Sequence, residues 1–262
     1  MAYSIKGLPW QYKGSKDVTQ CRTSAQVIEA AQLNWEVKKA EMVAKMPLSL
    51  DMDKNLDDLT EAKRRDNDAY ILGKNIYARC DNQYCTYRDD YKIPLGMVKG
   101  KYTIVQNSAA FKFFDTVIGE NSAIWQTAGF FGNGERIFVS AKLPDNILVH
   151  GDPVENYLVF TNSHDGSSGV RVLFTPIRVI CQNTLNAAIR TSTNSFSIRH
   201  TESVHKNIEI AHEILGITKK RIKDTEWAYN VLADIKLTDE DVMEYICKSN
   251  LTEAELEALN TT

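Results

Sequence analysis

Two hairpin signals in the middle of the 262-residue chain constrain its fold most strongly. Segments 123–130 and 136–143 flank the Gly-Asn-Gly sequence at 132–134, which is typical of a tight turn between antiparallel strands. A second pair of strand-like segments lies within 157–175, on either side of the polar loop 163–169. Because strands joined by short turns pair antiparallel, this pattern predicts a mostly antiparallel sheet.

Helical patterns occur before, between and after these strands. Thr23 and Gln26 fit a capping box at the start of the first predicted helix. The predicted helices span 24–33, 107–119, 180–189 and 204–235, and two shorter ones begin at Thr238 and Thr252. We therefore expect an α+β fold, with a curved, mostly antiparallel sheet backed by helices and followed by a helical C-terminal region.

Composition and patterning divide the chain into three segments. Residues 1–95 form an N-terminal α/β segment that contains a highly charged insertion at 45–69. Residues 96–201 form a central core of β-hairpins and helix, and residues 202–262 form a helical region with an acidic tail.

Several protein classes are excluded by what the sequence lacks. Its apolar runs fall short of the roughly 18–20 residues that cross a bilayer, and the first residues do not resemble a signal peptide. Five scattered cysteines favour a reducing cytoplasm over a disulfide framework. Since no phosphate loop, dinucleotide-binding glycine motif or zinc-ligand spacing is present, we expect no catalytic residue, no cofactor and no metal.

Charge is distributed unevenly along the chain. Residues 166–201 contain no Asp or Glu but four arginines, namely Arg171, Arg178, Arg190 and Arg199. Residues 225–262 instead contain nine acidic residues and two lysines. The arginines either pair with carboxylates distant in sequence, such as those of the acidic tail, or face an anion such as a nucleic acid or polyphosphate.

The loop after residue 160 is the densest polar cluster and has three possible roles. Asn162, His164 and Asp165 lie within it, beside three serines. The loop is a structural turn, a contact to a ligand or a catalytic element, although adjacent His and Asp residues cannot form a local relay with a serine. Cys181 lies where the next helix begins, as either a buried structural residue or part of an anion-binding helix start with Gln182 and Asn183.

Residues 161–188, TNSHDGSSGVRVLFTPIRVICQNTLNAA, together with Gly100–Asn107, resemble a phage/plasmid-like family of unknown function from bacteriophages and mobile elements. The order of predicted elements from 107 to 190 is similar to that of Rad fifty-two-like single-strand annealing proteins. The resemblance implies a protein of the bacterial host cytoplasm that forms a homo-oligomeric ring or filament. It implies no membrane partner, and a host protein partner is left open.

These observations lead to one preferred function and two alternatives. We expect a non-enzymatic protein that binds and anneals single-stranded DNA in recombination or replication. Its expected contacts are Arg171, Arg178, Arg190, Arg199, Lys99, Lys101, Gln182, Asn183, Asn162 and His164.

One alternative is a metal-dependent nuclease or nucleotide-acting enzyme that uses His164, Asp165 and either Cys181 or His200. The other is a protein-binding host-takeover or anti-defence factor. Its contacts would be made by segment 45–69 and the acidic tail.

Overall fold

The computed structural model describes residues 15–47, 69–72, 75–109, 111, 114, 124–143, 146–192, 195–206 and 218–250. The chain forms two compact units. The larger contains residues 1–146 and 155–218, and the smaller contains residues 147–154 and 219–262. The three-segment division expected from composition stays a prediction.

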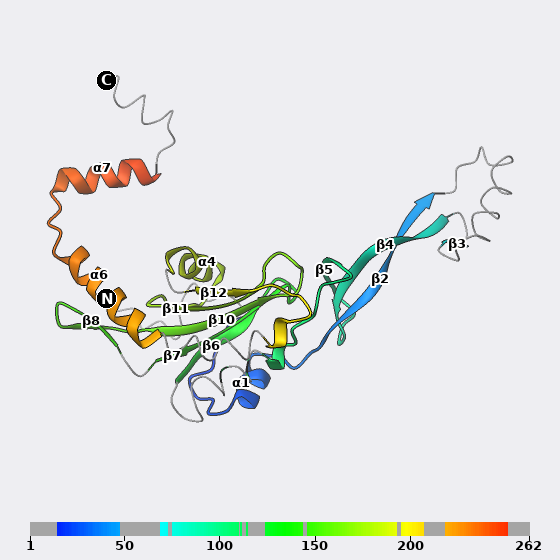
Figure 1. Ribbon diagram of the computed structural model, residues 1–262, viewed down its shortest axis with the longest axis horizontal. Coiled ribbons are helices and arrows are strands. Elements are labelled where there is room, and N and C mark those ends of the chain that lie inside the picture. Colours follow the sequence, from blue (N-terminus) through cyan, green and yellow to red (C-terminus); the bar gives the residue numbers. More distant parts are fainter. Residues whose placement is uncertain are drawn as a thin grey trace, which may run out of the picture. The chain divides into compact units, whose positions relative to one another are not determined.

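The main sheet of the larger unit contains both predicted hairpins (Figure 1). Its order is β1-β6-β7-β10-β11-β12, and every described pairing in it is antiparallel. The strands are β1 (Ser15–Asp17), β6 (Ile124–Phe131), β7 (Arg136–Lys142), β10 (Tyr157–Ser163), β11 (Val170–Thr175) and β12 (Ser195–Ile198). Together with the helices described below, this sheet confirms the α+β class.

The two faces of this sheet bury different apolar clusters. On one face Val139, Phe160 and Val172 pack in a cluster with residues of α1 (Ser24–Ala30) and of the chain that follows it. On the other face Phe138, Val159 and Leu173 pack with Leu185 and Ala188 of α4 (Gln182–Thr191). Side chains of neighbouring strand residues point to opposite faces, which explains this division. Burial of both faces stabilises the sheet.

The predicted capping box forms at the start of α1. The Thr23 side chain accepts a hydrogen bond from the Gln26 amide, and the Gln26 side chain accepts one from the Thr23 amide. Two backbone donors that the helix cannot satisfy are thereby bonded, as expected.

A second antiparallel sheet contains a long two-stranded ribbon. It has the order β2-β4-β3, with β5 also paired to β4. Its strands are β2 (Val37–Pro47), β3 (Ala69–Leu72), β4 (Asn75–Arg88) and β5 (Pro94–Lys99). The charged insertion predicted at 45–69 therefore begins and ends in strand, and residues 48–68 lie outside the described residues.

The Asp81-Asn82 pair is typical of a turn in sequence, but here a turn prediction is wrong, because β4 continues through the pair. The register between β2 and β4 shifts at Glu41/Val43, and Asn82 has a φ of 54°. Asn is one of the residues that tolerate this left-handed conformation, so the signal marks an irregularity within one strand instead of a chain reversal.

The side chain of Asn107, at the start of a helical segment, makes tertiary contacts. Its side-chain amide donates hydrogen bonds to the carbonyls of Leu33 (3.1 Å) and Trp35 (3.2 Å). Phe111 and Phe114 are buried, as their helical spacing predicted. The rest of the predicted helix at 107–119 lies outside the described residues.

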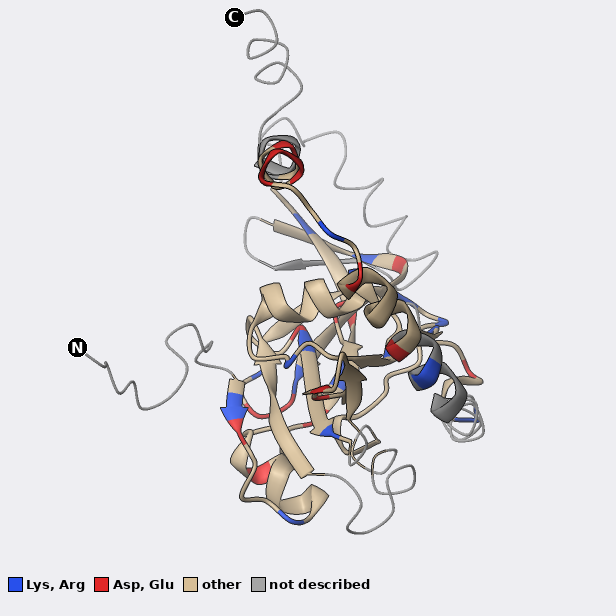
Figure 2. Cartoon of the chain, turned by 90° about the vertical axis from the view of Figure 1, so that its left-hand side faces the viewer, with Lys and Arg blue, Asp and Glu red and all other residues tan. Residues whose placement is uncertain are grey.

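The smaller unit consists of a hairpin and two helices. The elements are β8 (Ile147–Val149), β9 (Asp152–Val154), α6 (Thr218–Ala233) and α7 (Asp239–Asn250). Asn230 of α6 donates to the Leu148 carbonyl (2.7 Å) and accepts from the His150 amide (2.8 Å). Acidic residues gather in the first turn of α7, where the helix dipole favours them (Figure 2).

The predicted helix at 204–235 thus includes α6. Residues 207–217 of that prediction lie outside the described residues. The helix expected at Thr252 also lies outside them. In the described part of the chain, we find no helix that has both the length and the apolar character needed to span a bilayer.

Candidate nucleic-acid interface

A cavity of about 470 Å³ opens beside the end of β5, and we call it the trough. Three of the predicted phosphate-binding residues line it, and none of its lining residues is acidic. The lining residues are Met97, Val98, Lys99, Lys101, Tyr102, Gly166, Ser168, Gly169, Arg199, His200 and Thr201. They come from β5 and the turn after it, from the β10–β11 loop, and from the chain after β12.

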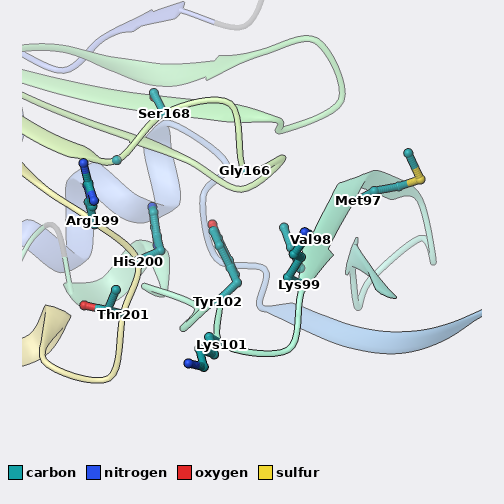
Figure 3. A pocket seen from close by; sticks show the side chains of 11 residues that line it. Met97, Val98, Lys99, Lys101, Tyr102, Gly166, Ser168, Arg199, His200 and Thr201 are labelled. Carbon is teal, nitrogen blue, oxygen red and sulfur yellow. The ribbon is translucent and has the colours of Figure 1, made fainter. Parts of the chain in front are cut away.

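The cations and aromatic rings follow one another along the trough (Figure 3). In this view Arg199 lies at one end, His200 and Tyr102 lie in the middle, and Lys99 lies towards the other end. The loop that contains Gly166 and Ser168 forms the opposite wall. The positive charges are therefore spread along the trough instead of meeting at one point.

The turn that carries Lys99 and Lys101 is held by hydrogen bonds from neighbouring strands. Lys39 of β2 donates from Nζ to the carbonyls of Gly100 (3.0 Å) and Tyr102 (2.9 Å). The Gly100 amide donates to Oδ1 of Asn82 in β4 at 2.9 Å. The Asn82 irregularity and Lys39 thus fix the backbone that presents the two exposed lysines.

Tyr102 and His200 form a stacked pair in the middle of the trough. Their ring centroids lie 4.5 Å apart with an interplanar angle of 18°. The Tyr102 hydroxyl donates to the Ser163 carbonyl (2.8 Å), and His200 Nδ1 lies 2.9 Å from the Thr103 carbonyl oxygen. Because a carbonyl only accepts, His200 carries its proton on Nδ1.

Both rings are held in their neutral forms. Burial lowers the pKa of His200, so the imidazole is uncharged at pH 7. Burial, with a smaller effect from the Asp165 charge, raises the pKa of Tyr102 well above its usual range. The middle of the trough is thus aromatic and neutral, and its positive charge comes from Lys99, Lys101 and Arg199.

The β10–β11 loop is an ordered turn that forms one wall. Asp165 Oδ1 accepts hydrogen bonds from the Ser163 hydroxyl (2.6 Å) and the Ser167 amide (2.8 Å). Although burial alone would raise the pKa of Asp165, these hydrogen bonds lower it. Among the three roles considered for this loop, the hydrogen bonds favour the structural turn, and Ser168 remains available as a ligand contact.

β5 approaches this loop closely at Gly96. A Cβ atom on Gly96 would lie 2.5 Å from the Asp165 Cα, so only glycine fits here. Thr86 joins the same elements, since its hydroxyl lies 2.7 Å from the His164 carbonyl and 3.2 Å from the Gly96 carbonyl. The two walls of the trough are therefore packed against each other at their base.

His164 and Asn162 lie inside the protein, where DNA bound at the surface does not reach them. His164 is fully buried, and its Nε2 donates to Asn107 Oδ1 at 2.9 Å, because both amide hydrogens of Asn107 are bonded elsewhere. Burial lowers the pKa of His164 to about 3. Asn162 is also buried and donates to the Val105 carbonyl at 3.0 Å.

The remaining predicted contacts lie outside the trough, on or near β11 and α4. Arg171 of β11 lies opposite Ser197 of β12, on the face where Leu173 packs towards α4. Arg178 Nη2 lies 3.9 Å from Asp17 Oδ2, and Arg190 is exposed in the last turn of α4.

Gln182 and Asn183 are in the first turn of α4, where Gln182 donates to Asn186 and Asn183 is exposed. Cys181 directly precedes this helix. The structure thus brings together Lys99, Lys101 and Arg199 but not the other three cations.

Sequence reasoning identified the trough cations but missed Lys39 and the pairing of Tyr102 with His200. Tyr102 lines the trough, whereas Phe131 of β6 and Phe160 of β10 are buried in the core. Apolar and charged residues alternate from Trp35 to Lys38, which indicates a strand, and Lys39 follows directly. This pattern is the signal that an exposed strand supplies cations beside the turn.

Comparison with known proteins gives a family but no described activity. No curated protein and no solved structure matches the chain. A family model described as "Domain of unknown function (DUF932)" matches residues 94–261, which is well over half of the chain and includes every residue that lines the trough. The chain therefore belongs to the DUF932 family of unknown function.

Proposed function

We propose that this protein binds single-stranded DNA along the trough and anneals complementary strands in phage-type recombination or replication. The observation that supports the proposal is the composition of one cavity. Lys99, Lys101 and Arg199 line it, none of its lining residues is acidic, and a stacked Tyr102–His200 pair lies between its ends.

This arrangement suits a linear polyanion better than a compact one. A free phosphate is bound best where several donors point at one position, whereas a strand carries its charges one after another. Proteins that bind single strands without sequence preference combine a positive groove with aromatic side chains. Contacts to the backbone leave the base edges exposed, which is what pairing with a second strand requires.

The cations outside the trough extend the proposal. Arg171 and Arg190 offer further phosphate contacts on the α4 side of the sheet, beyond the trough itself. By its similarity in element order to Rad fifty-two-like annealing proteins, the chain is proposed to act as a homo-oligomeric ring or filament.

The metal-dependent alternative receives no support from the geometry around His164. Its ring is buried, its Nε2 atom is bonded to Asn107, and the neighbouring Asp165 carboxylate is bonded within its own loop. A substrate at the surface therefore does not reach the His164 ring. We therefore retain strand binding as the proposed function.

Fluorescence anisotropy with a labelled oligothymidylate of about 30 nucleotides, over a range of salt concentrations, tests the proposal. The double variant Lys99→Ala/Arg199→Ala should bind at least about tenfold more weakly at low salt. Its slope of log affinity against log salt should be shallower by about 1.4, since each single-strand phosphate contact contributes about 0.7.

The matched control is Lys45→Ala/Lys236→Ala, which removes two exposed lysines outside the trough. This variant should bind with nearly the wild-type salt slope. Equal losses in both variants would show that net charge alone governs binding, and absence of binding by the wild type at low salt would refute the proposal. Annealing of two complementary labelled strands, with and without protein, then tests the second step.

A further inference from the structure

Exposed apolar side chains are concentrated on the smaller unit. Trp227 and Tyr245 are 70% and 74% exposed, although aromatic residues of this size are usually largely buried. Single exposed apolar residues are common, but a group of them marks a contact surface. The exposed apolar residues of the two helices and the segment between them are Trp227, Val231, Leu232, Ile235, Leu237, Val242, Met243 and Tyr245. We call them the helix patch.

The helix patch is surrounded by negative charge. Asp239, Glu240 and Asp241 form the first turn of α7, and Glu244 lies between Met243 and Tyr245. Residues 225–262 contain nine acidic residues and two lysines, which leaves 29 Lys and Arg and 25 Asp and Glu in residues 1–224. A surface that covers the helix patch must therefore be apolar at its centre and basic at its rim.

A surface of this chemistry is present on the larger unit, away from the trough. Arg178 follows Ile177 after β11, and Arg190 follows Ile189 in α4. Both isoleucines are only partly buried where they pack against the α4 cluster, and α4 itself contains no acidic residue. Arg178 has two exposed carboxylate neighbours, Asp17 at 3.9 Å and Glu155, whose pKa the charge of Arg178 helps to lower.

We propose that the helix patch of one copy of this chain docks on the Arg178–Arg190 surface of a second copy. The two surfaces differ, so the contact is head-to-tail, and a pair of copies keeps one unused surface of each kind. Such contacts generate rings when the rotation closes and filaments when it does not. This inference rests on the proposed self-association and names the surfaces that would produce it.

Light scattering after size-exclusion chromatography tests the apolar part of the contact. The wild-type chain should form assemblies whose mass rises with protein concentration. Trp227→Ser/Met243→Ser should be monomeric over the same range. Met46→Ser, which removes an exposed apolar residue from β2, should assemble like the wild type. A wild-type chain that stays monomeric at all concentrations would overturn the proposal, as would assembly of the double variant.

A charge exchange tests which surfaces meet. Glu240→Lys/Glu244→Lys brings the net charge of the four rim residues from −4 to zero, and Arg178→Glu/Arg190→Glu makes the opposing surface acidic. Each variant alone should remain monomeric, because the first loses the charge attraction between the two surfaces and the second replaces it with repulsion. An equimolar mixture should assemble again, because the new lysines of one kind of chain can pair with the new glutamates of the other.

If the helix patch instead docks on its own chain, the equimolar mixture of the two variants should also be monomeric. A monomeric mixture would therefore overturn the proposal. Circular dichroism of each variant checks that α7 still folds. Anisotropy with the oligothymidylate is measured on the same samples. Because Trp227→Ser/Met243→Ser changes none of the residues proposed to contact DNA, loss of assembly with retained DNA binding by this variant separates this inference from the proposed function. If the wild type binds no strand but the mixture assembles, only the proposed function fails.

Discussion

Nε2 of His164 lies 2.9 Å from Oδ1 of Asn107, in a hydrogen bond that joins the β10–β11 loop to the start of the helical segment at 107. The other two polar contacts of Asn107 go to the chain after α1, through Leu33 and Trp35. One buried amide thus connects three parts of the larger unit. His164 must be neutral in this position, since burial lowers its pKa to about 3.

The stability of the protein should therefore fall with acidification before carboxylates titrate. The unfolded chain binds a proton at His164 below a pH of about 6.5, whereas the folded chain does not until a pH of about 3. Stabilisation by neutral His164 is complete above pH 6.5 and is lost as the pH falls. The expected slope from this group is about 1.4 kcal/mol per pH unit between those limits, measured by urea unfolding.

His164→Gln provides the comparison, because glutamine retains a donor for Asn107 but does not titrate. The variant should be less stable at pH 7 but should show a shallower loss of stability between pH 6 and pH 4. Some slope should remain, since burial also lowers the pKa of His200. Parallel pH profiles for the variant and the wild type would contradict the assignment.

Substitution of Arg88 should destabilise the protein more than most other substitutions in the second sheet. Its guanidinium lies 4.3 Å from the Trp35 ring centroid and donates to Asp90 (2.6 Å) and to the Asn133 carbonyl (2.8 Å). Arg88→Met leaves these acceptors without their donor and should lower the free energy of unfolding by about 3 kcal/mol. Arg79→Met removes an exposed ion pair with Glu41 and should cost less than about 1 kcal/mol.

Gly96→Ala should widen the trough. The added Cβ would clash with the Asp165 backbone, so the loop must move or β5 must shift. We expect a loss of about 1–3 kcal/mol in stability together with weaker oligonucleotide binding. Gly151→Ala places a Cβ in open space at a φ of 89°, and it should cost stability without affecting binding. Unchanged binding by the Gly96 variant would show that the loop wall is not part of the interface.

Lys39→Met should weaken the binding of single-stranded DNA, because Lys39 holds the turn that contains Lys101. The variant removes two hydrogen bonds to the backbone around Lys101, so the lysines of the turn lose their fixed positions. Lys38→Met, one residue away, removes a lysine that is paired with Asp89 at 3.3 Å. Anisotropy should show a several-fold larger loss of affinity for the Lys39 variant, and equal losses would indicate an effect of charge alone.

The hairpins were predictable because their signals are local. The Gly-Asn-Gly turn and the polar loop after β10 each lie between the two strands they join, and both pairings form as expected. Asn82 shows the limit of such signals, since a residue that favours positive φ marks a bulge as readily as a turn. Asn107 has the side-chain chemistry of a helix cap, and the sequence did not indicate the tertiary hydrogen bonds that its amide makes to Leu33 and Trp35.

The sequence predicted individual cations of the trough but not that they line one cavity. Arg199 and Lys99 are separated by 100 residues, and their meeting depends on the pairing of β12 with β11 and of β5 with β4. Nothing in the sequence indicates these pairings. For the same reason the sequence did not separate Arg178 and Arg190 from Arg199, which belongs to the same acid-free segment, 166–201, but lines the trough.

The junction at Thr86 has a consequence for how a ligand meets the protein. The trough takes one wall from each of two sheets, and Thr86 and Gly96 bring those walls together at their base. The trough is therefore preorganised, because its width is set when the two sheets pack during folding. If the trough binds single-stranded DNA as proposed, the DNA gives up conformational freedom on binding and the protein gives up little.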